Sequence, residues 1–254
     1  MPSVSFPSAS AFPSASASAF PSGPPSFMAS PSSSHPIEFP VIFLRHGHAT
    51  HNEAVEKDGE GEYEKFEWKD AEMTSKGFSQ VDSLISSLIS PMRSSGSKIC
   101  AIYSSPLTRC IQTANIIQET LSDAPVITLV DNLIERQGKH PCNWRKEKNE
   151  LTSLWDTSID TTYLPTDIPV FDPLNIETDE SVIVRMNSFM QFMLHDLNNR
   201  RSSLPDSPVI LISTHHEVLK TMFNEFVDNG DYIAHKFILD SATNVWRPFH
   251  MSFA

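Results

Sequence analysis

Short runs of apolar, strand-forming residues alternate along this chain with stretches in which apolar residues recur at helical spacing. The strand-like runs are at residues 37–44, 99–103, 126–130 and 208–213, with a last edge strand expected at 237–239. Helical spacing is found between and after them, at residues 74–90, 106–121, 181–193 and 218–226. Strands that alternate with helices build a sheet with helices on both faces. We therefore predict an α/β fold, a three-layer α/β/α sandwich with a mostly parallel central sheet.

Two long stretches lack either pattern. Residues 46–70 are rich in Glu, Lys and Gly, which predicts a loop with at most one helical turn. Residues 138–178 contain four prolines and are predicted to be irregular. The helix that begins at Thr74 is predicted to end at Pro91, because proline has no amide N–H to continue the hydrogen-bond ladder. The apolar residues predicted to face the core from the helices include Phe78, Ile183 and Phe226.

The first 37 residues differ in composition from the rest of the chain. Of these, 27 are Ser, Pro or Ala, and no charged residue occurs before Glu38. Such a segment cannot bury enough apolar surface to offset the entropy of ordering a chain. We therefore predict a disordered tail over residues 1–37 and one folded domain over residues 38–254, which is long enough for a single core.

The charge of the chain excludes several classes of partner. A formal net charge of −12 and a pI near 5.2 argue against nucleic acid or anionic membrane bound through bulk charge. No apolar run reaches the ~18–20 residues of a membrane-spanning helix. The three cysteines lack CxxC spacing, which is typical of reduced thiols. We expect a cytoplasmic protein, with the nucleus as an alternative, and a small-molecule partner.

Polar side chains, most of them Arg or His, gather where the predicted strands end. They are Arg45, His46 and Asn52 after the first strand, Arg109 after the second, Glu135 after the third, and His215 and His216 after the fourth. Ligands of an open α/β sheet bind beyond the carboxyl ends of its strands. Positive groups at one rim of an otherwise acidic chain therefore predict a local pocket for an anion.

The residue types in this pocket suit phosphoryl transfer. Catalysis of that reaction consists largely of stabilising the charge on three phosphoryl oxygens in a fixed geometry. Arginine supplies bidentate donors that are always charged. A neutral histidine can act as the nucleophile, and a carboxylic acid can protonate the leaving oxygen and later activate water.

Five motifs, in order, resemble those of the histidine phosphatase (phosphoglycerate mutase-like) superfamily. Leu44-Arg45-His46-Gly47-x4-Asn52 resembles its RHGxxxxN signature. The other four are Met73-Thr74-x2-Gly77-x2-Gln80, Ser104-Ser-Pro-Leu-x-Arg109-x3-Thr113-Ala114, Leu133-Ile-Glu135-x2-Gly138 and Thr214-His215. The resemblance spans residues 37–250, which is nearly all of the predicted domain.

The resemblance implies a role for each matching residue. His46 would be the nucleophile that becomes phosphohistidine, with Gly47 allowing a close backbone approach beside it. Arg45, Arg109 and His215 would hold the phosphoryl oxygens, with Asn52 as a further contact. Glu135 would be the proton donor. No cofactor or metal is implied.

The family's variable region points to a phosphatase. The segment from Gly138 to Arg145 is similar to the HPC[DN]xR pattern of a fungal and plant subgroup of cytosolic mutase-like phosphatases. It favours hydrolysis of small phosphomonoesters over a phosphoglycerate-type mutase, which remains an alternative. His140, Arg145 and His216 are candidates for the leaving-group side of the pocket. His216 also stands where the family often has glycine, so it remains open whether it shares the role of His215.

Two other classes of function compete with this one. His46, His48 and His51 have the spacing of the two-zinc HxHxDH motif, although Thr50 replaces its aspartate. An arginine directly before the first histidine is also an unusual neighbour for a cation site. A catalytically weak interaction module on the same fold is the other alternative, but none of the key pocket residues is missing. His48 and His51 are interpreted as solvated loop residues.

Overall fold

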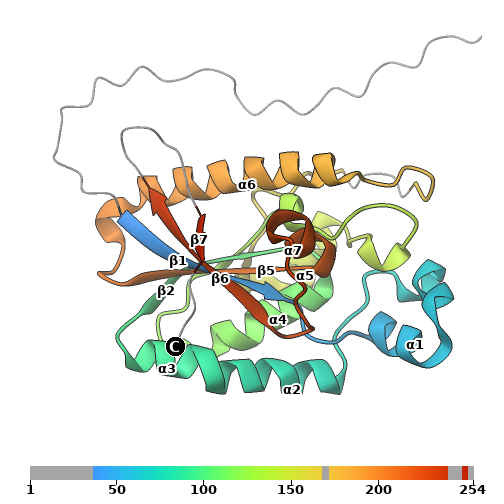
Figure 1. Ribbon diagram of the computed structural model, residues 1–254, viewed down its shortest axis with the longest axis horizontal. Helices are drawn as coiled ribbons and strands as arrows, with labels where there is room; N and C mark the ends of the chain where they lie inside the picture. Colours follow the sequence, from blue (N-terminus) through green and yellow to red (C-terminus); the bar gives the residue numbers. More distant parts are fainter. Residues whose placement is uncertain (1–36, 168–171, 240–247, 251–254) are drawn as a thin grey trace, which may run out of the picture. The chain divides into compact units, whose positions relative to one another are not determined.

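A seven-stranded sheet forms the centre of the protein in a computed structural model, which describes residues 37–167, 172–239 and 248–250 (Figure 1). The strand order is β4-β3-β2-β5-β1-β6-β7. The strands are β1 (Ile37–Arg45), β2 (Lys98–Ser104), β3 (Ile127–Leu129), β4 (Ile159–Asp160), β5 (Pro208–Thr214), β6 (Tyr232–Leu239) and β7 (Pro248–His250). Strands β1 to β5 pair in parallel, and β6 and β7 are antiparallel to their neighbours.

Helices cover both faces of the sheet, as the alternating sequence pattern predicts (Figure 1). The α-helices are α1 (Thr50–Asp58), α2 (Ser75–Leu84), α3 (Ser90–Ser94), α4 (Thr108–Glu119), α5 (Lys148–Trp155), α6 (Asp179–Asn199) and α7 (His216–Phe223). Helices α6 and α7 pack on one face, against Phe39, Val41 and Phe43. Helices α2 to α5 pack on the other face, against Ile42 and Leu44 of the same strand. Strand β1 thus buries both of its sides, which is why it reads as a continuous apolar run.

The helix that begins at Thr74 does not end at Pro91, contrary to the sequence prediction. Thr74 caps α2 by accepting the Gly77 N–H, and a π-helical turn, Ile85–Ile89, joins α2 to α3. Pro91 lies in the first turn of α3. In a regular helix its ring would clash with the carbonyl four residues earlier, and the wider π turn relieves that clash.

Other sequence predictions are corrected by the packing. Helix α1 lies in the predicted loop 46–70, and α5 with β4 lies in the stretch predicted to be irregular. Strand β6 is not an edge strand, because β7 pairs with its outer side. Phe78, Ile183 and Phe226 are 41%, 40% and 76% exposed, so none of them is in the core. The predicted tail lies outside the described residues except for Ile37, which begins β1.

Candidate active site

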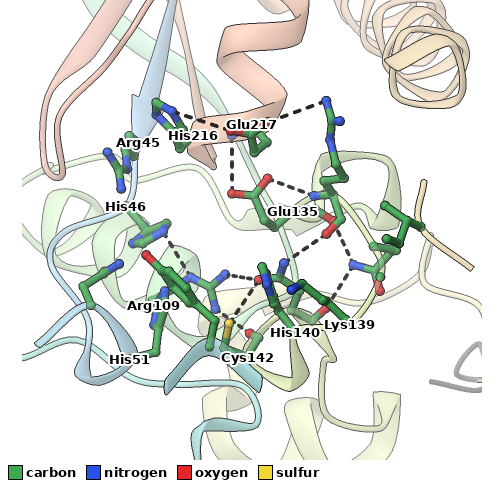
Figure 2. Close-up of a pocket in the computed structure, with 17 residues that line it drawn as sticks. Arg45, His46, His51, Arg109, Glu135, Lys139, His140, Cys142, His216 and Glu217 are labelled. Carbon is green, nitrogen blue, oxygen red and sulfur yellow. Dashed lines mark hydrogen bonds and ion pairs between the residues drawn. The ribbon is translucent and has the colours of Figure 1, made fainter. Parts of the chain in front are cut away.

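A cavity of about 360 Å³ lies at the carboxyl ends of the parallel strands, where the sequence places the anion pocket (Figure 2). Seven of the predicted site residues line it: Arg45, His46, Asn52, Arg109, Glu135, His140 and His216. The other lining residues are His51, Tyr63, Arg136, Gln137, Gly138, Lys139, Cys142, Asn143, Ile176 and Glu217. Segments far apart in the sequence therefore meet in one cavity.

His46 is the first residue after β1, and it is only 3% exposed. Its Nδ1 lies 2.8 Å from the Gly47 carbonyl oxygen, which can only accept, so Nδ1 carries the ring proton. Its Nε2 accepts a 3.1 Å hydrogen bond from Nε of Arg109. Burial and the nearby guanidinium groups hold the pKa of His46 well below its usual value. The ring is therefore neutral, and its lone pair is on Nε2, where it accepts the hydrogen bond from Arg109.

The backbone that carries His46 is held against α2 and α4. The Gly47 N–H donates to Oγ1 of Thr113 at 3.0 Å, and the His48 N–H donates to Oε1 of Gln80 at 2.8 Å. A Cβ on Gly77 would lie 2.2 Å from the His48 carbonyl oxygen. Two of the sequence motifs thus have a structural role, because their Thr, Gly and Gln residues fix the loop that carries His46.

Arg45 and Arg109 bring positive charge to either side of His46. The Arg109 side chain is 1% exposed and donates to the Cys142 carbonyl at 2.7 Å and to Oδ1 of Asn143 at 3.1 Å. Arg45 donates to the Val227 carbonyl at 2.8 Å. Neither guanidinium forms an ion pair with a carboxylate among the residues that the structure describes. Two partly uncompensated charges beside a buried histidine make a site that favours an anion.

His215 lies directly behind this pair and is fully buried. Its ring centroid is 5.1 Å from that of His46, and its Nδ1 is 3.4 Å from Nη2 of Arg109. Its Nε2 is 2.7 Å from Oγ of Ser105. The side chain does not line the cavity, whereas the neighbouring His216 does. His215 thus supports Arg109 and His46 from beneath.

Glu135 faces the same cavity from the segment that follows β3 (Figure 2). Its carboxylate accepts the backbone N–H of Arg136 at 2.8 Å and that of Glu217 at 3.4 Å. Both bonds come from the backbone, and no cationic side chain within the described residues forms an ion pair with this carboxylate. Glu135 is 9% exposed, and its carboxylate is held in position by these two backbone donors.

The interpretation of His48 and His51 as solvated loop residues is wrong, because both side chains are buried. His51 lies in the first turn of α1, is 4% exposed and lines the cavity beside His46. Its Nδ1 is buried without a hydrogen-bond partner in the described residues. Its ring lies 5.8 Å from that of Tyr63, which stacks on His140 with centroids 5.1 Å apart and planes 28° apart. In the sequence, only the position of His51 directly before Asn52 could have indicated that it lies in the cavity.

Arg145 does not reach the leaving-group side of the cavity, contrary to the sequence expectation. It is 1% exposed, and its guanidinium pairs with Asp131 at 2.8 Å and donates to the carbonyls of Lys146 and Pro165. These contacts fasten the segment after Glu135 to the body of the domain. Asn52 does line the cavity, but its Oδ1 is already used as the acceptor of the Ala49 N–H.

The zinc hypothesis fails on geometry. His48 turns away from the cavity, with Nδ1 2.8 Å from Oγ1 of Thr74 and Nε2 3.1 Å from Oε1 of Glu56. The remaining nitrogen of His46, Nε2, accepts from the guanidinium of Arg109, a cation that would repel a metal ion. No group of three or more His, Cys, Asp or Glu side chains within residues 37–167, 172–239 and 248–250 is arranged to hold a metal ion.

The sheet order, the histidine at the end of β1 and the arginines beside it agree with the resemblance of the sequence motifs to the histidine phosphatase superfamily. Residues 41–246 match the sequence pattern of the histidine phosphatase superfamily, branch 1, and the chain belongs to that superfamily. A curated fungal relative, a probable phosphoglycerate mutase from Arthroderma benhamiae, is 28% identical over 173 residues. That match covers 61% of this chain and 50% of the relative, so the chain spans about half the length of the relative.

Solved structures share this fold at low sequence identity. The ecdysone phosphate phosphatase of Bombyx mori is 17% identical with a TM-score of 0.56, covering 84% of this chain and 92% of that one. A phosphoglycerate mutase from Bacillus anthracis is 16% identical with a TM-score of 0.53, again covering 84% and 92%. Likeness at this level establishes the phosphoglycerate mutase-like fold. In the part of the chain that the structure describes, no helix is long and apolar enough to cross a membrane.

Proposed function

We propose that this protein is a phosphatase that hydrolyses small organic phosphomonoesters through a phosphohistidine at His46. The observation that carries the proposal is the neutral, buried His46, which lines a cavity beside two arginines that have no carboxylate partner among the described residues. A phosphoryl group supplies the negative charge that these arginines lack.

In the first step, the Nε2 lone pair of His46 attacks phosphorus and the P–O bond to the leaving group breaks. Arg45 and Arg109 neutralise the phosphoryl oxygens, and Arg109 must turn its Nε–H from His46 to the phosphate. Glu135 gives its proton to the leaving oxygen, which departs as an alcohol. In the second step, Glu135 takes a proton from water as the water oxygen attacks phosphorus, and the P–N bond breaks to release phosphate.

His51 belongs to this proposal as a further donor to the phosphoryl group. Buried polar atoms without a partner are rare in proteins, and one that faces a ligand cavity marks a group that the ligand satisfies. Nδ1 of His51 is buried without a partner among the described residues, and His51 lines the cavity. Burial and the nearby arginines hold the pKa of His51 well below its usual value, so its ring is neutral and carries one N–H.

The proposal is tested by replacing the nucleophile. His46→Ala should abolish hydrolysis of p-nitrophenyl phosphate, and the acid-labile, alkali-stable phosphoryl label that substrate leaves on the wild-type protein should vanish with it. His195→Gln, a change at an exposed histidine, should keep both. Activity or label that survives in the His46 variant would exclude the mechanism.

A phosphoglycerate-type mutase is the second candidate, because the fungal relative has that name. A mutase keeps the phosphoryl group on histidine and returns it to a bound product, whereas a phosphatase gives it to water. Incubation with 3-phosphoglycerate, followed by phosphorus NMR, separates the two. We expect inorganic phosphate from the preferred substrates and no interconversion of phosphoglycerates. The three free cysteines also support a proposed site of action in the reducing cytoplasm.

A further inference from the structure

The cavity extends beyond the three residues that would contact the phosphoryl group. Its inner end is formed by His46, Arg45 and Arg109, and its volume of about 360 Å³ lies within the usual range for small-molecule sites of about 300–1,000 Å³. Part of the remaining surface, which we call the outer wall, is formed by Tyr63, Lys139, His140, Ile176, His216 and Glu217. The leaving group of a phosphomonoester would lie against this outer wall.

The cations near the outer wall already have carboxylate partners. The Lys139 Nζ lies 2.5 Å from Oε1 of Glu64. Arg136 pairs with Asp179 and lies 3.6 Å from Oε2 of Glu217. Burial lowers the pKa of both His140 and His216, so neither imidazole supplies a positive charge near neutral pH. Of the described residues that line the cavity, only Arg45 and Arg109 are cations without an acid partner.

The outer wall therefore offers no unpaired cation to a second anionic group among the described residues. Glu217 lies in this wall and is already paired with Arg136 at 3.6 Å and with Lys220 at 3.3 Å. A second carboxylate or phosphate on the leaving group would lie beside Glu217 without a free cation to offset its charge. Like charges brought together in a binding site oppose binding strongly.

The outer wall also presents flat and apolar surfaces. Tyr63 and His140 stack on each other, with ring planes 28° apart. Ile176 is 58% exposed although it is a large apolar residue, and it is held in place by its neighbours. The Glu177 N–H donates to the Gln137 carbonyl at 2.9 Å, and the Glu177 carboxylate binds Arg185 at 2.7 Å. An exposed isoleucine fixed at the edge of a cavity offers a contact to an apolar ligand.

From this wall we infer the substrate class, which rests on the phosphatase activity proposed above. The geometry points to monophosphate esters of uncharged, ring-containing alcohols or phenols. The phosphoryl group is the only anionic part of such a substrate, and its ring packs against Tyr63 and Ile176. Substrates whose leaving group carries a carboxylate or a second phosphate are selected against.

A matched pair of substrates tests the charge. 4-Carbamoylphenyl phosphate and 4-carboxyphenyl phosphate have nearly the same shape, but only the second has an anionic leaving group. We expect kcat/KM to be at least about fivefold higher for the carbamoyl compound. Equal values, or a preference for the carboxylate, would overturn the inference.

A pair of variants is compared on the same two substrates, so that any other chemical difference between the two leaving groups cancels. Glu64→Gln removes the partner of Lys139 and leaves a free cation at the outer wall. The ratio of kcat/KM between the carbamoyl and the carboxy compound should then fall by about two- to threefold, as expected for the loss of an exposed ion pair. Glu60→Gln makes the same change of charge in the same short helix without touching Lys139. An identical preference in both variants would contradict the assignment.

The ring contact has its own test. Tyr63→Leu keeps an apolar side chain but removes the flat face, and should lower the preference for 2-naphthyl phosphate over glycerol 3-phosphate by about fivefold. Tyr63→Phe removes only the hydroxyl and should retain the preference. A preference that Tyr63→Leu leaves unchanged refutes the ring contact. If His46-dependent hydrolysis of p-nitrophenyl phosphate is absent, the proposed function itself fails. If it is present without these preferences, only the substrate class fails.

Discussion

At the scale of single residues, the chemistry of His46 is set by what its two ring nitrogens touch. Nδ1 is committed to the Gly47 carbonyl, so the lone pair must be on Nε2. Arg109 donates its Nε–H to that lone pair at 3.1 Å. In the proposed mechanism, a phosphate that attracts the guanidinium would also free this lone pair for attack. The tautomer, the charge and the readiness of the nucleophile thus follow from three contacts.

Replacing the proposed acid should separate good from poor leaving groups. In Glu135→Gln, kcat/KM for an alkyl phosphate such as glycerol 3-phosphate should fall about 10²–10⁴-fold, because the alkoxide then leaves without a proton. The p-nitrophenolate ion is a weak base, so the loss for p-nitrophenyl phosphate should be less than about tenfold. The ratio of kcat/KM is the right measurement, since it reports the transfer to His46 and not the later attack of water. Equal losses would remove Glu135 from the acid role.

The unpartnered nitrogen of His51 gives a second test at this scale. His51→Phe keeps the ring volume but has no donor, and should weaken inhibition by vanadate about tenfold, as expected for a hydrogen bond to a charged group. His51→Asn places an amide near the position of Nδ1 and should recover most of that loss. Urea unfolding of both variants checks that neither is simply unfolded. Equal vanadate inhibition in wild type and His51→Phe would show that His51 does not contact the phosphoryl group.

At the scale of elements, the sequence predicts best where an element buries apolar residues periodically. The strands and the long helices α4 and α6 follow such patterns. Helix α1 has no such pattern, because the residues it buries are His51, Asn52 and Ala54, and the first two line the cavity. Arg145 was misplaced for a related reason, since sequence spacing does not reveal that Asp131 is its partner.

The contact between α2 and the nucleophile loop should be intolerant of one methyl group. In Gly77→Ala, the new Cβ would lie 2.2 Å from the His48 carbonyl oxygen, a backbone atom that cannot turn aside. The exchange should destabilise the protein by about 1–3 kcal/mol, although glycine to alanine within a helix ordinarily stabilises by about 0.5–1 kcal/mol. Activity should fall with it, because the displaced loop carries His46.

Gly61→Ala is the matched control, because nothing lies within 4 Å of a Cβ at that position. Urea unfolding and p-nitrophenyl phosphate hydrolysis of the two variants provide the measurements. If Gly77→Ala is as stable and active as Gly61→Ala, the loop is not held by this contact.

At the scale of the whole molecule, three buried histidines make stability depend on pH. Burial holds the pKa of His46, His51 and His215 well below 6.5, so the folded protein does not take up the protons that the unfolded chain binds near that value. The unfolded state therefore binds more protons, and stability is lost as pH falls below about 6.5. Each histidine contributes a slope of up to about 1.4 kcal/mol per pH unit.

Urea unfolding at pH 7.5 and pH 5.5 measures this dependence. We expect a clear loss of stability at pH 5.5, which millimolar inorganic phosphate should partly restore by binding the folded protein. His51→Asn should reduce the slope, whereas His195→Gln should not. A stability that is flat over this range, or that rises at pH 5.5, would show that the three rings are not held neutral.

The hydrogen bonds that hold the loop of His46 against α2 and α4 also determine how fast the amide hydrogens of that loop exchange with solvent. The N–H groups of Gly47 and His48 are bonded to side chains of α4 and α2, Thr113 and Gln80, and not to a neighbouring strand. Their protection should therefore follow the opening of those two helices and not the global unfolding of the sheet. The rate at which these two N–H groups exchange in deuterium oxide should therefore report the opening of α2 and α4, two helices that contribute no nucleophile, acid or base to the proposed mechanism.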